Sequence, residues 1–321
     1  MGDAVVSDTG ELSKQEVERH KLPSNGRWFW RLRGCGDDAA SSGLEEFTAG
    51  HPTDAPAATW DNVRNKNAGS KIFGWFSGRD EYASALLEPS EKTVPCGYEL
   101  IRKGMDVKAF ADFDAKFAVD GSATEPELHE RAKEQFRGYL VSLKERCEKW
   151  IGIQPIMYVS DSCRLVPGGH SYKASFHVTI TNVVFSNVDL RDNWMHSLFS
   201  IAKASLKPDP SVYNSDVRSM RAVGNAKKTS PDVKLTMDYG LSSAECVQTS
   251  LLPTLITYLE GCPQRVTLVV QKSGICNYPN FHNVFLKRPN GKKRTRAGGG
   301  ESGQASNGCG RCHSPLSTIR P

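Results

Sequence analysis

The chain of 321 residues is long enough for two compact modules with flexible tails, and its 38% hydrophobic and 24% charged residues are typical of a globular protein. No apolar run approaches the roughly 20 residues that a membrane-spanning helix needs, which excludes that class of membrane protein. The net charge of +5 is compatible with nucleic-acid binding but does not require it. Nine cysteines without a recognisable secretory leader predict a reducing intracellular location, nuclear or cytoplasmic.

Residues 1–70 are predicted to form a leader and a loop-rich segment. Residues 1–26 are mostly polar, and residues 34–70 have the Ala, Ser, Gly, Asp, Asn and Pro content of loops or disorder. Between them, Trp28, Phe29 and Trp30 lie among arginines. This aromatic cluster could stack on single-stranded bases. We favour the alternative, a short strand that packs on the core.

Residues 71–270 carry the patterns of a folded core. Residues 125–150 are predicted to be a helix, because Thr124 suits its N-cap and apolar residues recur at helical spacing. Alternating patterns predict paired strands over residues 154–162 and 171–185. Helices between non-adjacent strands predict an α+β fold with a mixed or antiparallel sheet. Further elements are expected as a helix over residues 189–206, a short helix around 251–259, and strands over 232–239 and 264–271.

A pair of aspartates lies on the predicted strand over residues 107–117. Asp112 and Asp114 are two residues apart, so they share one strand face. Adjacent carboxylates repel each other, and an ordered pair suits a hard divalent cation such as Mg²⁺ or Mn²⁺. A solvated strand face is the alternative interpretation.

A second alternating pattern follows in the predicted strand over residues 171–185. Lys173, Ser175 and His177 share a polar face, while the residues between them are apolar. An ammonium, a hydroxyl and an imidazole in a row can donate several hydrogen bonds to phosphate oxygens. An ordinary half-exposed strand is the alternative.

A third pattern combines a carboxylate with cations. Asp209 lies between two prolines that hold its backbone extended. Asp216 is a second candidate carboxylate. It ranks lower because it is close enough in sequence to pair with the arginines. The stretch behind is predicted to be a basic loop. A solvated loop is the alternative. The cations of this stretch suit phosphate binding, and they are Arg218, Arg221, Lys227 and Lys228.

Taken in this order, the three patterns resemble those of the archaeo-eukaryotic primase superfamily, in particular its primase-polymerase and herpes–pox-type viral primase branch. The motifs are Asp-x-Asp, Lys-x-Ser-x-His, Asp-x-x-Val-Tyr and Arg-x-x-Arg, and they span about residues 98–228. The resemblance covers a Tyr-Glu pair ahead of the first motif. One departure is that Arg218 follows Tyr213 with one residue more than the family spacing.

This resemblance implies an RRM-like catalytic sheet beside a smaller α/β module. It implies that Asp112, Asp114 and Asp209 bind catalytic Mg²⁺ or Mn²⁺, and that His177 belongs with them to the catalytic residues. The contacts it implies with the nucleotide and its triphosphate come from Lys173, Ser175, His177, Arg218, Arg221 and Lys227.

The function expected from this resemblance is that of a DNA primase or primase-polymerase, which joins nucleoside triphosphates on a single-stranded DNA template. Two alternatives are a related polymerase that extends primers without initiating them, and a non-catalytic nucleic-acid-binding module. The sequence contains no phosphate-binding loop of a helicase motor. A helicase partner is therefore expected on another chain or in a missing C-terminal region.

Residues 271–321 differ in composition from the core. Residues 287–296 hold six basic residues and no acidic one, which is typical of a disordered, solvated tail. A zinc knuckle is the alternative interpretation, because two cysteines lie in Cys-x-x-Cys spacing. Its four ligands would be Cys276, His282, Cys309 and Cys312.

Overall fold

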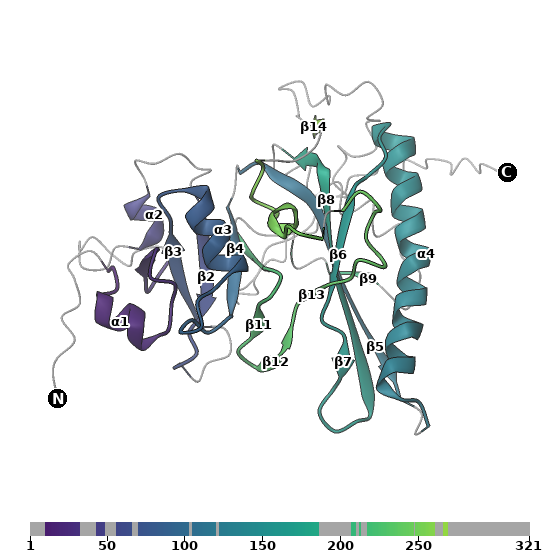
Figure 1. Ribbon diagram of the computed structural model, residues 1–321, viewed down its shortest axis with the longest axis horizontal. Coiled ribbons are helices and arrows are strands. Elements are labelled where there is room, and N and C mark those ends of the chain that lie inside the picture. The colour runs from purple at the N-terminus through teal and green to yellow at the C-terminus, as the bar shows by residue number, and fades with distance from the viewer. Residues whose placement is uncertain are drawn as a thin grey trace, which may run out of the picture. The chain divides into compact units, whose positions relative to one another are not determined.

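The computed structural model describes residues 10–32, 43–48, 56–65, 70–102, 105–119, 122–185, 207–209, 212, 217–246, 248–260 and 266–268. All of them belong to the first of two units, Met1–Lys287 and Arg288–Pro321. The fold of the described part is α+β, as expected, with mainly antiparallel sheets and few helices (Figure 1). No helix in these ranges combines the length and apolarity that crossing a membrane requires.

The first sheet has five antiparallel strands in the order β1-β3-β2-β4-β10. Three short helices accompany it, and a small hairpin, β11–β12, follows β10. The strands are β1 (Arg27–Phe29), β2 (Ala57–Asp61), β3 (Lys71–Trp75), β4 (Gly97–Arg102) and β10 (Val217–Arg221), the helices are α1 (Lys14–Arg19), α2 (Leu44–Phe47) and α3 (Arg79–Leu87), and the hairpin is β11 (Ala226–Lys227) and β12 (Ser230–Lys234).

The aromatic cluster near the N-terminus belongs to the core of this sheet. Trp28 is fully buried, and its ring packs edge-on against Trp60 and Phe76, with centroids 5.6 and 5.9 Å apart. Its indole N–H donates to the Pro23 carbonyl oxygen at 2.8 Å. The favoured prediction of a packed strand is confirmed, and Trp28 has no exposed face on which a base could stack.

One expectation for the N-terminal segment is wrong. Residues 34–70 were predicted to be loops, whereas Ala57–Asp61 form β2, a buried strand between β3 and β4. The strand is only five residues long and includes two alanines. Its apolar signal is therefore lost in the average composition of the segment, and pairing on both edges stabilises it instead.

The second sheet has seven strands, with the central path β13-β6-β8-β5-β9, and β7 and β14 also pair with β8. Helix α4 (Glu125–Ile151) runs along one face of this sheet (Figure 1). Of the short helix expected around residues 251–259, the structure has only the single-turn 3-10 helix η3 (Leu252–Thr254). The strands are β5 (Val107–Ala118), β6 (Met157–Asp161), β7 (Arg164–Leu165), β8 (Ser171–Phe185), β9 (Lys207–Pro208), β13 (Thr236–Met237) and β14 (Val266–Leu268).

Helix α4 confirms the helix predicted from residue spacing. It begins with a capping box in which Thr124 and Glu127 satisfy each other's backbone N–H groups, and it ends at Gly152, which has the left-handed φ of 77° that glycine tolerates. Its apolar face packs on the sheet: Phe136 stacks on Phe176 of β8 with ring centroids 4.2 Å apart. This contact buries one face of β8 and leaves the other for polar residues.

The segment around η3 joins the two sheets. The buried carboxylate of Glu99 in β4 accepts hydrogen bonds from the backbone N–H groups of Ile256 and Thr257, both at 2.8 Å. The buried ammonium of Lys108 in β5 donates to the carbonyl oxygens of Pro253 and Leu255 at 3.0 and 2.8 Å. One segment is thus bound by both sheets, which sets the position of β4 relative to β5. The helix expected over residues 189–206 lies outside the described residues.

Candidate active site

The polar face of the second sheet is built from cross-strand pairs of β5 and β8. The antiparallel register places Asp112 opposite His177 and Asp114 opposite Ser175. Opposite residues share a face, so these four side chains gather there, while Phe113 and Phe176 point to the α4 side. The Lys173 ammonium lies 2.8 Å from the Asp114 carboxylate. The two patterns recognised separately in the sequence therefore form one surface.

Asp209 joins this surface through strand β9. Its backbone N–H donates to the carbonyl oxygen of Asp112 at 2.7 Å, and β9 pairs with β5 so that Pro208 lies opposite Phe113. The same register puts Asp209 beside Asp112, where opposite Cα atoms are typically about 4.5–5.5 Å apart. The negative charge of Asp209 is one of the causes that raise the pKa of Asp112. Three carboxylates thus converge at one point.

Asp112 has an electrostatic environment that fits a cation. Its side chain is 15% exposed, and its pKa is raised to about 7 by burial and then by the charges of Asp114 and Asp209. Within the described residues its Oδ1 atom is buried without a hydrogen-bond partner, since His177 Nε2 is 3.4 Å away and poorly placed. A divalent ion would supply the missing partner and remove the repulsion, and oxygen ligands suit Mg²⁺ or Mn²⁺.

Asp114 and His177 ionise differently from Asp112. Burial opposes ionisation of Asp114, but the hydrogen bond and charge of Lys173 outweigh it and lower the pKa of this carboxyl. The pKa of His177 falls to about 3 because of burial and then the positive charge of Arg221. His177 is therefore neutral at pH 7. It can donate one hydrogen bond but adds no charge.

Cations approach the acidic cluster from the first sheet and its hairpin. Arg221, at the end of β10, is buried and donates to the Ser162 hydroxyl at 2.7 Å. In the described structure its buried Nε has no hydrogen-bond partner. The pKa of Lys227 in β11 is lowered by partial desolvation and then by the charges of Arg221 and Lys173, which places these three cations near one another. Such clustered cations suit a polyanion.

Arg218 differs from Arg221 in its position. The stretch was expected to be a loop, but residues 217–221 form the extended strand β10. Residues three apart on a strand point to opposite faces, so Arg218 shares a face with Met220 rather than with Arg221. The structure therefore brings Arg221 and Lys227 to the acidic cluster. Arg218 lies on the opposite face of β10 from Arg221 and does not join them on that face. In a helix or a loop, two arginines with Arg-x-x-Arg spacing could both contact one ligand, whereas on a strand they cannot share a face.

Ser162 was not recognised in the sequence. Its hydroxyl positions Arg221 from the end of β6, where Ser160 also lies opposite His177. The signal that could have found it is the alternation of small hydroxyl residues in the stretch 160–162. Several predicted residues lie outside the described ranges: Asp216, the basic run at 287–296, and the four proposed zinc ligands Cys276, His282, Cys309 and Cys312.

No protein-family model matches the chain, and no curated protein matches its sequence.

Proposed function

We propose that this chain is a metal-dependent nucleotidyltransferase that acts as a DNA primase or primase-polymerase. The observation that carries the proposal is the convergence of Asp112, Asp114 and Asp209 on the same sheet face as a set of phosphate-binding donors. In this proposal the second sheet is the RRM-like catalytic sheet and the first sheet belongs to the smaller module. The template is single-stranded DNA, and the substrates are nucleoside triphosphates.

The three carboxylates would hold Mg²⁺ or Mn²⁺, which would make the attacking 3′-hydroxyl more acidic and neutralise the leaving pyrophosphate. Asp112 is suited to this because its buried Oδ1 lacks a hydrogen-bond donor among the described residues. Asp114 is held in its ionised form by Lys173. The chain thus supplies the charge and the orientation that the ions need.

The donors on the same surface would bind the triphosphate. Arg221 is oriented by Ser162, so its guanidinium needs little reorganisation when a phosphate arrives. Lys227 remains exposed and can follow the leaving pyrophosphate. His177, neutral at pH 7, would donate a hydrogen bond to a phosphate oxygen. Catalysis would therefore rest on positioning and electrostatic stabilisation.

The direct test is incorporation of labelled nucleotides on a single-stranded DNA template. The assay runs with and without a primer, with ribo- and deoxynucleotides, in Mg²⁺ or Mn²⁺. We expect incorporation that Asp112→Asn abolishes and that Glu145→Gln, the same chemical change at an exposed position of α4, leaves intact. Activity only with a primer would indicate a non-initiating polymerase. Template binding without incorporation in either metal would refute the proposed enzyme.

A further inference from the structure

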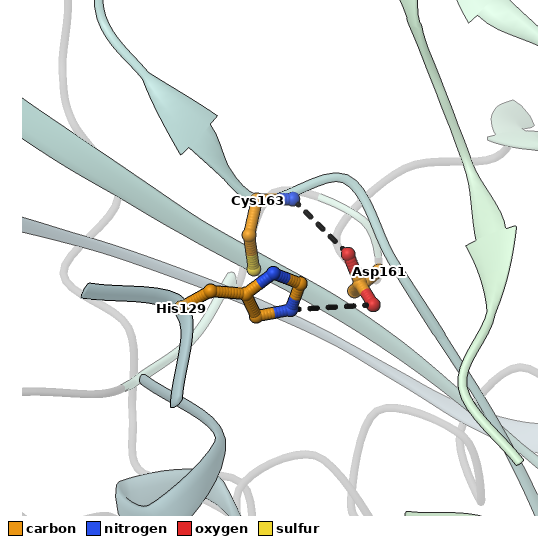
Figure 2. Close-up of side chains that lie close together, drawn as sticks. All are labelled: His129, Asp161 and Cys163. Carbon is orange, nitrogen blue, oxygen red and sulfur yellow. Dashed lines mark hydrogen bonds and ion pairs between the residues drawn. The ribbon is translucent and has the colours of Figure 1, made fainter. Parts of the chain in front are cut away.

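A second group of side chains that could ligate a metal ion lies on the α4 side of the second sheet. It consists of His129 in the second turn of α4, Asp161 at the end of β6, and Cys163 just before β7 (Figure 2). Asp161 is opposite Phe176 in the register, and Phe176 packs on α4. The cluster is therefore separated by the sheet from the polar face that carries Asp112.

We propose that His129, Asp161 and Cys163 bind a zinc-like divalent ion, with solvent as the fourth ligand. One ligand atom from each residue lies within 4.8 Å of the others, and His129 Nε2 is 3.8 Å from Asp161 Oδ2. In a tetrahedral site with bonds of about 2.0–2.3 Å, ligand atoms lie roughly 3.3–3.8 Å apart. Small side-chain rotations would close the site.

Two of the three ligand residues, His129 and Asp161, are poorly satisfied by the protein. His129 Nε2 is buried without a hydrogen-bond partner in the described structure, because its distance to Asp161 Oδ2 is too long for a hydrogen bond. The other oxygen of Asp161 receives only a long hydrogen bond, 3.4 Å, from the Cys163 backbone N–H. A metal ion would give His129 Nε2 the partner that it lacks and would add a stronger one for Asp161.

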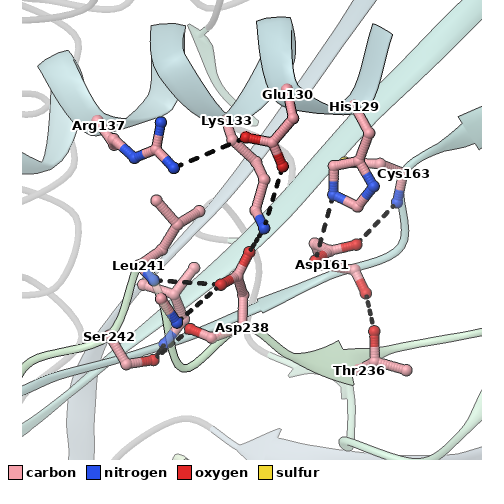
Figure 3. Close-up of polar contacts among 12 residues, drawn as sticks. His129, Glu130, Lys133, Arg137, Asp161, Cys163, Thr236, Asp238, Leu241 and Ser242 are labelled. Carbon is pink, nitrogen blue, oxygen red and sulfur yellow. Dashed lines mark hydrogen bonds and ion pairs between the residues drawn. The ribbon is translucent and has the colours of Figure 1, made fainter. Parts of the chain in front are cut away.

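The charges of the cluster match a divalent ion of this type. Metal binding would displace the Cys163 thiol proton to solvent, and the resulting thiolate together with the Asp161 carboxylate would balance two positive charges. The nearby ammonium of Lys133 lies 2.7 Å from the Asp238 carboxylate and 3.8 Å from Glu130 (Figure 3). Its charge is therefore already compensated. A sulfur, nitrogen and oxygen ligand set favours zinc over Mg²⁺ or Ca²⁺.

Surrounding contacts support a site that is anchored and lies near the protein surface. The Cys163 sulfur accepts a hydrogen bond from the Ser175 backbone N–H at 3.3 Å, which orients it from β8. The side chain of His129 is 34% exposed, although its Nε2 atom is buried, so the cluster lies near the protein surface. An ion here would tie α4 to the β6–β7 connection and, through Ser175, to the strand that carries the candidate active site.

The test uses the full-length chain with Cys276, Cys309 and Cys312 replaced by serine, so that the tail cannot contribute a thiolate. After removal of metal by a chelator, Co²⁺ is added as a spectroscopic probe and Zn²⁺ is then titrated against a chromophoric chelator. We expect Co²⁺ bound by Cys163 to give a near-ultraviolet thiolate charge-transfer band and visible bands of tetrahedral geometry, whereas Co²⁺ held by the three carboxylates of the candidate active site gives no thiolate band. Zinc should displace the Co²⁺ bound by Cys163.

Three variants locate the site. Cys163→Ser should abolish the charge-transfer band, whereas Cys246→Ser, a change at another partly buried thiol, should leave it unchanged. His129→Ala, on the partly exposed side of α4, should weaken Zn²⁺ affinity by more than about tenfold, because even outer-shell partners of a metal site contribute 10- to 100-fold. Circular dichroism confirms that each variant is folded. Absence of the band in the parent, or its persistence in folded Cys163→Ser, would overturn the proposal.

Discussion

Replacing Asp112 with Asn should stabilise the metal-free protein while it destroys the proposed activity. The carboxylate is held at a pKa of about 7, against 3.8 for an unperturbed Asp, by burial and by the neighbouring carboxylates. This difference of about 3 pKa units corresponds to an upper limit of ~4 kcal/mol of unfavourable free energy when Asp112 ionises in the fold. Asn has nearly the same shape and carries no charge.

The sign of the effect depends on pH. Because the folded pKa is raised, the native state keeps its full stability below pH 4, where Asp112 is protonated in both states, and loses it as pH rises through 7. The advantage of Asp112→Asn should therefore be largest above pH 7 and should disappear near pH 4. Added Mg²⁺ or Mn²⁺ should stabilise the parent protein and reduce the difference.

Urea unfolding with a chelator present, at pH 8 and again at pH 5, measures this prediction. Glu145→Gln is the control, since an exposed carboxylate on α4 should change stability by less than about 0.5 kcal/mol at both values. If Asp112→Asn lowers the stability of the metal-free protein at pH 8, or if its gain is the same at pH 5, the electrostatic account of the acidic cluster is wrong.

Three further changes test the other contacts. His177→Ala should weaken nucleotide binding about 10- to 100-fold, which is the value of one hydrogen bond to a charged group. Its circular dichroism spectrum should be unchanged. Normal nucleotide affinity in a calorimetric titration would contradict the proposed role of His177. Ser162→Ala should lower the rate of nucleotide incorporation by about tenfold, because Arg221 loses the hydroxyl to which it donates at 2.7 Å. Equal incorporation rates in this variant and the parent protein would show that Ser162 does not orient Arg221. Lys108→Met should cost about 2–4 kcal/mol in urea unfolding, because one buried and one partly buried carbonyl oxygen lose their donor. The control is Lys116→Met at an exposed position of the same strand, and equal effects of the two changes would refute the prediction.

Local periodicity in the sequence was sufficient for the main elements. The two-residue alternation in 107–117 and 171–185 determined which side chains of β5 and β8 share a face, because strand geometry alone sends successive side chains to opposite sides. The cap at Thr124 and the apolar spacing behind it determined α4 in the same way. These signals are short-range, so neighbouring residues carry them completely.

Contacts between distant segments were decided only by the tertiary structure. Asp209 reaches Asp112 because β9 pairs with β5, and that pairing depends on backbone hydrogen bonds that no residue pattern encodes. Arg218 and Arg221 separate because β10 is extended where the composition indicated a loop. In both cases, pairing with a neighbouring strand of the same sheet selects the backbone conformation: β9 pairs with β5, and β10 pairs with β4.

The cluster of His129, Asp161 and Cys163 shows the same division. Each residue alone is unremarkable in the sequence, since His129 reads as one position of an amphipathic helix and Cys163 as part of a turn. They meet only because α4 packs across the end of β6. The sequence by itself determined which elements form and which faces they bury. The positions of side chains on those faces follow from packing between elements that are far apart in the chain. This packing is a property of the whole fold.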